Sequence, residues 1–440
     1  MLIFLQGSPS GKIACIIMKA AGGICHMKNQ EAMRCLLCPK PRCSESCPVH
    51  TPVPECMRYY REDRLEEAGR VLFQNNPMTA VTSQVCDWKK FCYGHCVLNA
   101  RNVPVRWYEI EQEISEAYLL NHHEDKPEQN GKNVAVIGAG PAGMTAAILL
   151  AQKGYLIDLY DDHERPGGVL RYGIPPFRLD RKYSDAYERI MKELGVVFHP
   201  NVKIGSEVTA DSLAMSHDAV LVASGAVKPR ALRIPGEELP HVRHAITWLG
   251  DPKAEDLGEH VIVIGGGNVA MDACRTAERF GKDTWVYYRK TFENMPANPL
   301  EVEEAKKEGV RFSVFEAPVE IRNHSVIFRK CENVTDENGK IVTKILPDTD
   351  HEVPCDTLLI AAGETIDLSV FGDHTPELNE WHYLKTDEDG KTSLENVWVA
   401  GDLRLGARTV VEAAATAKKS ALAIDSALMG KLPEALRKKE

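Results

Sequence analysis

The stretch Asn-Val-Ala-Val-Ile-Gly-Ala-Gly-Pro-Ala-Gly at residues 133–143 decides the fold. Its apolar first half predicts a buried strand, and the alanine-rich segment behind it, to about Lys153, predicts a helix. Residues 156–161 predict the next strand. A strand, a helix and a strand in this order form a βαβ unit, so we expect a parallel sheet with helices on both faces.

The glycine spacing in this stretch is the fingerprint of a dinucleotide-binding turn. Gly138 permits the tight turn, Gly140 lets the backbone approach a pyrophosphate, and Gly143 lets the helix pack closely against the strand. Asp161, about twenty residues further on, is expected to accept hydrogen bonds from both hydroxyls of a ribose. The residues of the turn predicted to contact the nucleotide are Gly138, Gly140, Pro141, Ala142 and Gly143.

Three further segments favour FAD at this first site. The long irregular stretch at residues 166–179 could line the ribityl chain and the ring of a flavin. Residues 397–402 predict a strand that ends in Gly-Asp, and this carboxylate could hold a ribityl hydroxyl. The helix that starts near Thr409 could direct its positive N-terminus at a reduced flavin. The predicted FAD contacts outside the glycine turn are Asp161, Gly168, Leu170, Arg178, Gly225, Gly401, Asp402 and Thr409.

A second glycine turn, at residues 265–270, predicts a second nucleotide domain. The strand after it ends in Arg289 and Lys290 and not in an acid, and a cation there accommodates a 2′-phosphate. We therefore expect NADPH, with NADH as the alternative if the two side chains are only solvated surface cations. The predicted contacts are Gly265, Gly267, Asn268, Val269, Ala270, Arg289 and Lys290.

Cysteines are concentrated at the front of the chain, where ten of the thirteen precede residue 97. From Cys35 the spacing is Cys-x2-Cys-x4-Cys-x3-Cys-Pro, and from Cys86 it is Cys-x5-Cys-x3-Cys. Thiolates hold iron–sulfur clusters, and the fourth cysteine of such a run can serve the other cluster. Zinc sites and a disulfide scaffold are the alternatives, but both fit the front of a large two-nucleotide enzyme less well.

Composition limits the class of protein. The 440 residues suffice for about three domains, and 44% apolar with 26% charged residues predicts a soluble, cytoplasmic protein. A net charge of −10 argues against nucleic acid as a partner, and no apolar run approaches the roughly 20 residues of a membrane span.

The predicted fold is α/β, with a helical N-terminal iron–sulfur domain followed by two Rossmann-like dinucleotide-binding domains. Apolar residues recur at helical spacing in the iron–sulfur domain. The predicted domains are an N-terminal extension (1–30), the iron–sulfur domain (31–126), an FAD domain (127–240 with 362–440) and an NAD(P)H domain (241–361).

These motifs resemble those of one family, the small (beta) subunit of bacterial glutamate synthase together with the flavin part of dihydropyrimidine dehydrogenase. The resemblance covers about residues 31–430, and it implies FAD, NAD(P)H and two 4Fe-4S clusters. It rests on the motifs at residues 34–38, 47–50, 168–175, 267–272 and 400–402.

The resemblance also implies the cluster ligands. One cluster would use Cys35, Cys38, Cys43 and Cys96, and the other would use Cys47, Cys86, Cys92 and an oxygen ligand from the helix that follows. Glu111 matches that oxygen ligand, with Gln112 and Glu109 as alternatives. The chain departs from the family at Asp87, where proline is usual, and at residues 107–109, which replace a glycine-bearing stretch. It also has Pro296 where the NADPH-using dehydrogenase commonly has a third cation.

The function implied is that of an electron-input subunit. It would pass electrons from NAD(P)H through FAD and the clusters to a separate catalytic subunit that contains FMN or iron–sulfur clusters. Hydride transfer needs no side-chain acid, base or nucleophile, so no catalytic residue is predicted. The alternatives are the flavin subunit of an NAD(P)-dependent dihydropyrimidine dehydrogenase, a thiol–disulfide reductase, and a redox-sensing flavoprotein that is not an enzyme.

Overall fold

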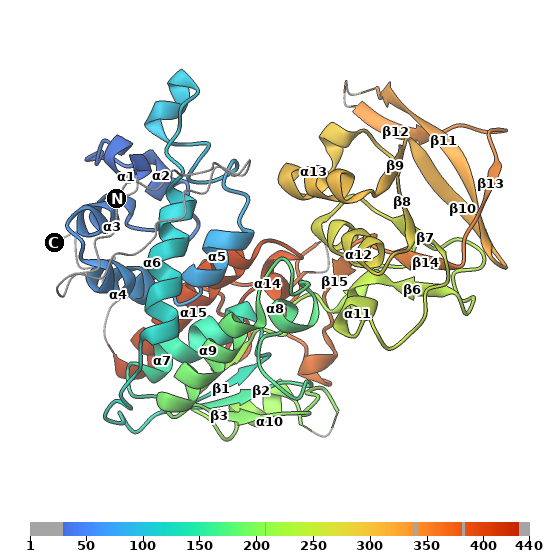
Figure 1. Ribbon diagram of the computed structural model, residues 1–440. Helices are drawn as coiled ribbons and strands as arrows, with labels where there is room; N and C mark the ends of the chain where they lie inside the picture. Colours follow the sequence, from blue (N-terminus) through green and yellow to red (C-terminus); the bar gives the residue numbers. More distant parts are fainter. Residues whose placement is uncertain (1–29, 207, 338, 340, 381–382, 431–440) are drawn as a thin grey trace.

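A computed structural model of the chain describes residues 30–206, 208–337, 339, 341–380 and 383–430 (Figure 1). The predicted N-terminal extension lies outside these residues, except for Gln30, and so do Cys15 and Cys25.

The front of the chain is helical, as the sequence predicted. Proline at the first turn of one helix, Val53–Arg61, is tolerated because the N–H that it lacks would have no partner there. The apolar faces meet in a core around Met57, Leu72 and Ile110, which are at most 1% exposed. The helices are α1 (Gln30–Arg34), α2 (Arg42–Glu45), α3 (Val53–Arg61), α4 (Leu65–Asn75), α5 (Thr79–Val85), η1 (Val97–Arg101) and α6 (Trp107–Asn121).

The first βαβ unit belongs to a five-stranded parallel sheet of strand order β16-β4-β1-β2-β3. Alternate residues of its central strand point to opposite faces, so each face has its own core. Helices α7, α9 and α15 cover one face, and α10 lies on the other (Figure 1). The elements are β1 (Asn133–Ile137), α7 (Pro141–Ala151), β2 (Leu156–Tyr160), α8 (Val169–Tyr172), α9 (Arg181–Glu193), β3 (Val197–His199), α10 (Ala210–Ala214), β4 (Ala219–Val222), β16 (Val397–Val399), α14 (Asp402–Leu405) and α15 (Val410–Met429).

The second glycine turn belongs to another parallel sheet, of strand order β6-β14-β7-β8-β9. Helices α11, α12 and α13 pack against one face of this sheet. Its elements are β6 (Val242–His244), α11 (Ala245–Gly250), β7 (His260–Ile264), α12 (Asn268–Arg279), β8 (Asp283–Tyr288), η2 (Phe292–Asn294), α13 (Pro299–Glu308), β9 (Arg311–Val314) and β14 (Thr357–Ile360).

An antiparallel sheet covers the other face of this second sheet. Ile262 and Ile264 of β7 pack with Ile321, Val326 and Phe328 of that sheet, which extends to the edge of the molecule (Figure 1). No βαβ unit in the sequence predicts this sheet. Its strands are β10 (Glu316–Arg322), β11 (Ser325–Thr335), β12 (Ile341–Ile345) and β13 (His351–Pro354).

The chain leaves the first sheet for the second, and returns, through a small antiparallel ribbon. Its strands are β5 (Lys228–Pro229) and β15 (Glu364–Thr365), with η3 (Ser369–Phe371) after the return. The exact domain boundaries stay a prediction.

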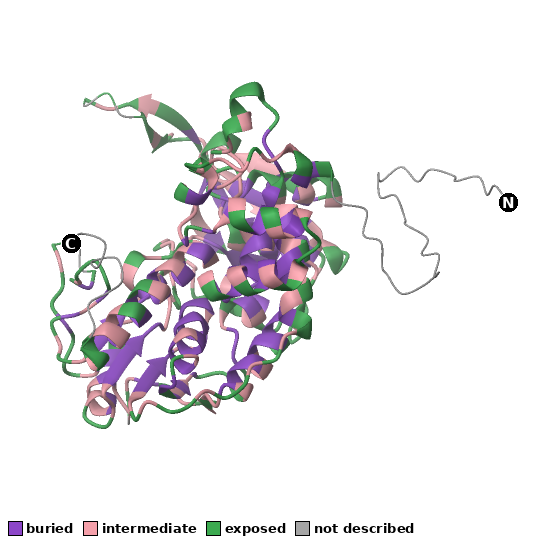
Figure 2. Ribbon diagram, turned by 90° about the vertical axis from the view of Figure 1, so that its left-hand side faces the viewer, coloured by how far each residue is buried: buried purple, intermediate pink, exposed green. Residues whose placement is uncertain are grey.

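The helical domain packs against the first nucleotide domain in one continuous core. Phe73, Met78 and Leu119 are buried together with residues of α7 and α9 (Figure 2). Tyr183 on α9 donates a hydrogen bond to Glu116 on α6 at 2.9 Å. Within the described part of the chain, no helix is both long enough and apolar enough to cross a membrane.

Candidate cofactor sites

Segments distant in sequence meet at the first glycine turn. The N–H of Gly167 donates to the carbonyl of Ala139 at 2.8 Å. A Cβ on Gly168 would lie 2.7 Å from the Cα of Gly140, and one on Gly401 would lie 2.9 Å from the Cβ of Ala142. The fold therefore brings three of the predicted FAD segments together, at a place where backbones approach too closely for side chains.

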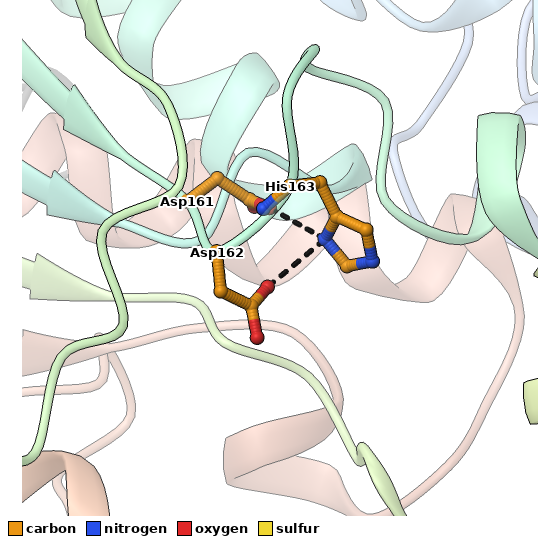
Figure 3. A group of neighbouring side chains, drawn as sticks. All are labelled: Asp161, Asp162 and His163. Carbon is orange, nitrogen blue, oxygen red and sulfur yellow. Dashed lines mark hydrogen bonds and ion pairs between the residues drawn. The ribbon is translucent and has the colours of Figure 1, made fainter.

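Asp161 lies at the end of β2 and is tied to the glycine turn. Its Oδ2 accepts from the N–H of Ala139 at 2.6 Å, and its Oδ1 is 2.7 Å from Nδ1 of His163 (Figure 3). Hydrogen bonds to Asp161 and Asp162 raise the pKa of His163 to about 10. The ring is therefore a cation at neutral pH and offsets the two carboxylates. The predicted ribose contact of Asp161 stays a prediction.

Asp402 begins the short helix α14, and Thr409 directly precedes α15. Thr409 caps this helix and forms a reciprocal capping box with Glu412. The N–H of Arg408 donates to Oδ1 of Asp402 at 3.1 Å. Burial raises the pKa of Asp402 to about 7, and the N–H of Arg408 opposes the shift. A half-buried carboxyl with spare acceptor capacity fits the role of holding a hydroxyl group.

The other predicted FAD contacts differ in their surroundings. Leu170 is fully buried in the core of the first nucleotide domain. Gly225 has φ of +77° and open space where a Cβ would be. The guanidinium of Arg178 forms ion pairs with Asp272 and Glu301 of the second nucleotide domain. Contacts of these three residues with FAD remain predictions.

The second glycine turn has the geometry of a phosphate site. Gly265 has φ of +144°, and a Cβ on Gly267 would meet open space. Asn268 begins α12, and its Oδ1 accepts from the N–H of Asn298 at 2.9 Å. Val269 packs at the edge of the core, and Ala270 is fully buried in it. The open backbone at the start of α12 leaves N–H donors for a pyrophosphate.

Arg289 and Lys290 directly follow β8, beside this turn. Tyr288 packs its ring where a Cβ on Gly266 would lie, at 2.7 Å. Arg289 is exposed and Lys290 half-buried. Among the ion pairs of the described residues, neither cation has a carboxylate within 4.0 Å. Both charges are therefore available to a 2′-phosphate.

The fold gathers one group of predicted cluster ligands beside the core of the helical domain. Burial raises the pKa of Cys35, and Cys38 and Cys96 add to this shift. Burial likewise raises the pKa of Cys43 to about 11, with contributions from Cys35 and Cys96. These four thiols are therefore electrostatic neighbours, as the first predicted ligand set requires. A pocket lined by all four opens beside Leu36.

The second group of predicted ligands forms around a carboxylate. Burial raises the thiol pKa of Cys47, Cys86 and Cys92, and for each of them the next cause is Glu111. Lys418 on α15 lies beside this group: burial lowers its pKa, and Cys47 opposes the shift. The second group is therefore next to the first nucleotide domain.

Glu111 is only 7% exposed, on the inner face of α6. Burial raises its pKa to about 7, and its Oε1 accepts a hydrogen bond from the hydroxyl of Thr79 at 3.1 Å. Of the two alternatives, Glu109 is half-exposed and paired with Arg106, and Gln112 is half-buried. A buried carboxylate that faces three thiols fits a metal centre, because bound cations favour the ionised forms.

The spread of the ligands fits iron–sulfur clusters better than zinc. A tetrahedral zinc site brings its sulfurs to about 4 Å from one another. In the described part of the chain, the only group of three or more His, Cys, Asp or Glu ligand atoms within 4.8 Å of one another is Asp161, Asp162 and His163. All eleven described cysteines are free, so those thiols form no disulfide scaffold. Seven thiols and a carboxylate in two open groups match two clusters.

Glu111→Ala should lose iron, and Glu109→Ala should not. Removal of the buried oxygen donor leaves the second cluster with three protein ligands. The protein should therefore lose two or more of its roughly eight irons. Glu111→Gln keeps an oxygen donor and should retain most of the iron. The measurement is iron and acid-labile sulfide per chain after anaerobic purification. Equal iron in the Glu111→Ala and Glu109→Ala proteins would rule out Glu111.

The fold and these sites define an oxidoreductase with two nucleotide domains and a front domain of clustered thiols. Residues 132–421 match the family described as pyridine nucleotide-disulphide oxidoreductase, and residues 20–122 match dihydropyrimidine dehydrogenase domain II, 4Fe-4S cluster.

Curated relatives agree with the family matches. The glutamate synthase (NADPH) small chain of Azospirillum brasilense is 32% identical over 87% of this chain and 85% of its own length. The subunit beta of an NADP(+)-dependent formate dehydrogenase from Moorella thermoacetica is 30% identical over 88% of this chain and 60% of its own length. Mycobacterium tuberculosis FprA in complex with NADPH has the same fold over 68% of this chain and 85% of its own, at 19% identity and a TM-score of 0.58.

This chain therefore belongs to the pyridine nucleotide-disulphide oxidoreductase family, together with the glutamate synthase small chains. The predicted resemblance, the α/β fold and the oxidoreductase class are confirmed, and so are FAD, NAD(P)H and 4Fe-4S clusters as the cofactors. The role is that of an electron-transfer flavoprotein.

Proposed function

We propose that this chain is the electron-input subunit of a larger oxidoreductase of the glutamate synthase type. The two glycine turns would hold FAD and NAD(P)H and the front thiols would hold the clusters, and these groups would supply hydride and single-electron chemistry. The chain binds and orients these groups, and a separate catalytic subunit performs the substrate chemistry. We assign this electron transfer to the cytoplasm, because thiol ligands stay reduced there.

The observation that carries the proposal is the order of the ligand groups between the nucleotide domains and the surface. Cys47 and Cys86 border the core that the helical domain shares with the first nucleotide domain. Cys35, Cys43 and Cys96 border the separate core of the helical domain, and so does Cys92 of the second group, which lies between the two sets. Two clusters held in this order would bridge the flavin site and the far end of the molecule.

The first ligand group lies at the surface through which electrons would leave. The pocket beside it includes Leu36 and Val97, which are 61% and 38% exposed. Exposed apolar side chains beside a redox centre are typical of a surface that another protein covers. This supports a partner that takes the electrons.

Relatives support a partner and leave two candidates. The glutamate synthase small chains are named as one chain of an assembly, which favours a glutamate synthase large subunit. The match of residues 20–122 to a dihydropyrimidine dehydrogenase domain favours a partner with dihydropyrimidine dehydrogenase activity. Either partner would contain FMN or iron–sulfur clusters.

The deciding experiment is anaerobic affinity purification of the tagged chain from its own cells. We expect a second polypeptide that accepts electrons from NAD(P)H only through this chain, whereas the isolated chain reduces ferricyanide with NAD(P)H. Glutamine-dependent glutamate formation or dihydropyrimidine turnover would then identify the partner. Oxidation of a small organic substrate by the pure chain alone would refute the proposal, and negligible ferricyanide reduction would indicate a sensor.

Arg289→Ala combined with Lys290→Ala should remove a preference for NADPH. Loss of charged hydrogen bonds to the 2′-phosphate should lower kcat/KM for NADPH about tenfold to a hundredfold, with little change for NADH. Lys307→Ala, an exposed lysine paired with Glu304 on α13, serves as the control. Steady-state kinetics with both nucleotides make the measurement. A wild-type kcat/KM that favours NADH about tenfold would contradict the assignment of a 2′-phosphate site.

A further inference from the structure

Arg178 connects the two nucleotide domains. It follows α8 in the first domain, and its Nη1 lies 2.8 Å from Oδ2 of Asp272 on α12 of the second domain. Its Nε lies 3.1 Å from Oε1 of Glu301 on α13. The three side chains are 9%, 5% and 15% exposed. One guanidinium thus joins two helices of the other domain in a nearly dry contact.

The contact continues beyond this residue. Phe177 packs its ring against two arginines of α12, with the guanidinium carbons of Arg275 and Arg279 at 4.9 Å and 4.0 Å from the ring centre. Arg275 and Arg279 both pair with Glu308 of α13, at 2.7 Å and 2.6 Å. Phe177 and Arg178 therefore enter a network of charges that belongs to the second domain.

The backbone that carries these two residues is rigid. The N–H groups of Arg178 and Leu179 both donate to the carbonyl of Pro175 at 3.0 Å. Leu179 is 1% exposed in the core of the first domain, and Asp180 caps α9. Phe177 and Arg178, which we call the clamp, are therefore held in place by the core of the first domain and do not lie on a loose loop.

On the other side, the clamp holds the helix that begins the nucleotide site. Asp272 is one helical turn beyond Asn268, the first residue of α12 after the open backbone of Gly267. Asn298, which precedes α13, hydrogen-bonds Asn268. Movement of α12 and α13 relative to the first domain would therefore move the phosphate site with them.

Covalent connections alone leave this orientation weakly determined. The chain crosses between the domains only through β5 and β15, a ribbon of two residues on each strand. Such a short two-stranded ribbon can bend and twist. Near this contact α11 also approaches α8: a Cβ on Gly173 would lie 3.2 Å from Cδ1 of Ile246, and one on Gly250 would lie 3.5 Å from the carbonyl oxygen of Tyr172.

We propose that Arg178, with Phe177, is a positioning residue that sets the angle between the two nucleotide domains for hydride transfer to the flavin. Reacting atoms must lie about 3–3.5 Å apart, and a shift of about 1 Å can cost a hundredfold in rate. The clamp fixes α12, whose N-terminal turn begins the predicted NAD(P)H site, relative to the first domain. The inference rests on the NAD(P)H-to-FAD part of the proposed function and is independent of the clusters and of the partner.

Anaerobic stopped-flow reduction of the FAD-loaded, full-length protein by NADPH or NADH tests the clamp. Arg178→Met should lower the limiting rate of flavin reduction, measured per bound FAD, about tenfold to a hundredfold, while reduction of the bound flavin by dithionite stays at the wild-type level. Arg178→Lys, which keeps one charge but cannot bridge both acids, should be intermediate. Asp272→Asn should slow reduction as well, and the double variant should be no slower than the worse single variant, because the pair acts as a unit.

A second readout needs no nucleotide. Hydrogen exchange of the backbone amides in α12 and α13 should rise in Arg178→Met, because the helices lose their contact with the first domain. Arg165→Met is the control, since Arg165 pairs only with Asp185 and Glu188 of its own domain and should change neither readout.

The possible outcomes distinguish a failure of the proposed function from a failure of the proposed role of Arg178. A wild-type flavin that neither NADPH nor NADH reduces would overturn the proposed function. A wild-type flavin that is reduced, together with an Arg178→Met rate within about twofold of it, would overturn the clamp. A slower rate that comes only from lost FAD or a lower Tm, with unchanged hydrogen exchange, would also overturn it.

Discussion

Cys86→Ala should contain about four irons per chain where the wild type contains about eight. Cys86 is half-buried beside Cys47, Cys92 and Glu111, and its loss leaves the second ligand set one sulfur short. Because this group lies between the flavin site and the outer ligand group, the variant should also fail to deliver electrons to the partner. Reduction of ferricyanide should persist, because this acceptor can take electrons at the flavin.

The matched control for Cys86 is Cys56→Ala. Cys56 is a buried thiol of the same helical domain, and its Sγ contacts the carbonyl of Ala68 at 3.9 Å. It should keep all of the iron and lose only some stability. The measurements are iron, acid-labile sulfide and NADPH-driven reduction of the co-purified partner. A Cys86→Ala protein with full iron would refute the second ligand set.

Gly143→Ala should disrupt the first nucleotide site. A Cβ at this position would lie 1.8 Å from the carbonyl oxygen of Gly138, so α7 must move away from β1. Overpacking of this severity costs about 3 kcal/mol of stability or more. The protein should purify largely without FAD and with a lower Tm, as flavin absorbance and thermal unfolding would show.

Gly267→Ala provides the contrast in the second turn. Gly267 has no atom within 4 Å of a Cβ, so this variant should fold and keep its FAD. The added methyl group would instead occupy the open space that a pyrophosphate needs, so NAD(P)H binding should weaken. Equal Tm losses in Gly143→Ala and Gly267→Ala would contradict this account of the two turns.

Much of the fold could be predicted because its signals are local. The strand at Asn133–Ile137 and the helix that starts at Pro141 were predicted from an apolar run and a glycine turn, and the structure has both. The second turn gave the same result at β7 and α12. The antiparallel sheet from Glu316 to Pro354 escaped prediction, because strand pairing there depends on contacts with β7 and not on a local motif.

The complete sets of cluster ligands were predicted from the family resemblance and not from the cysteine spacing alone. Spacing alone indicated iron–sulfur clusters, but the division of the cysteines into two sets came from the family. The two ligand sets stay a prediction, and the folded chain adds the burial of Glu111 beside Thr79, which distinguishes this residue from Glu109. Burial of one face of α6 cannot be read from a helix that has acids on several faces.

By itself, the sequence determined the two glycine turns, the supply of thiols and hence the class of cofactors, because turn geometry and ligand chemistry reside in a few neighbouring residues. Only the tertiary structure decided which segments meet at each site. It paired Arg178 with Asp272, 94 positions away, and so assigned a predicted flavin contact to the joint between two domains. Such pairings depend on how separate layers pack, and no local pattern encodes them.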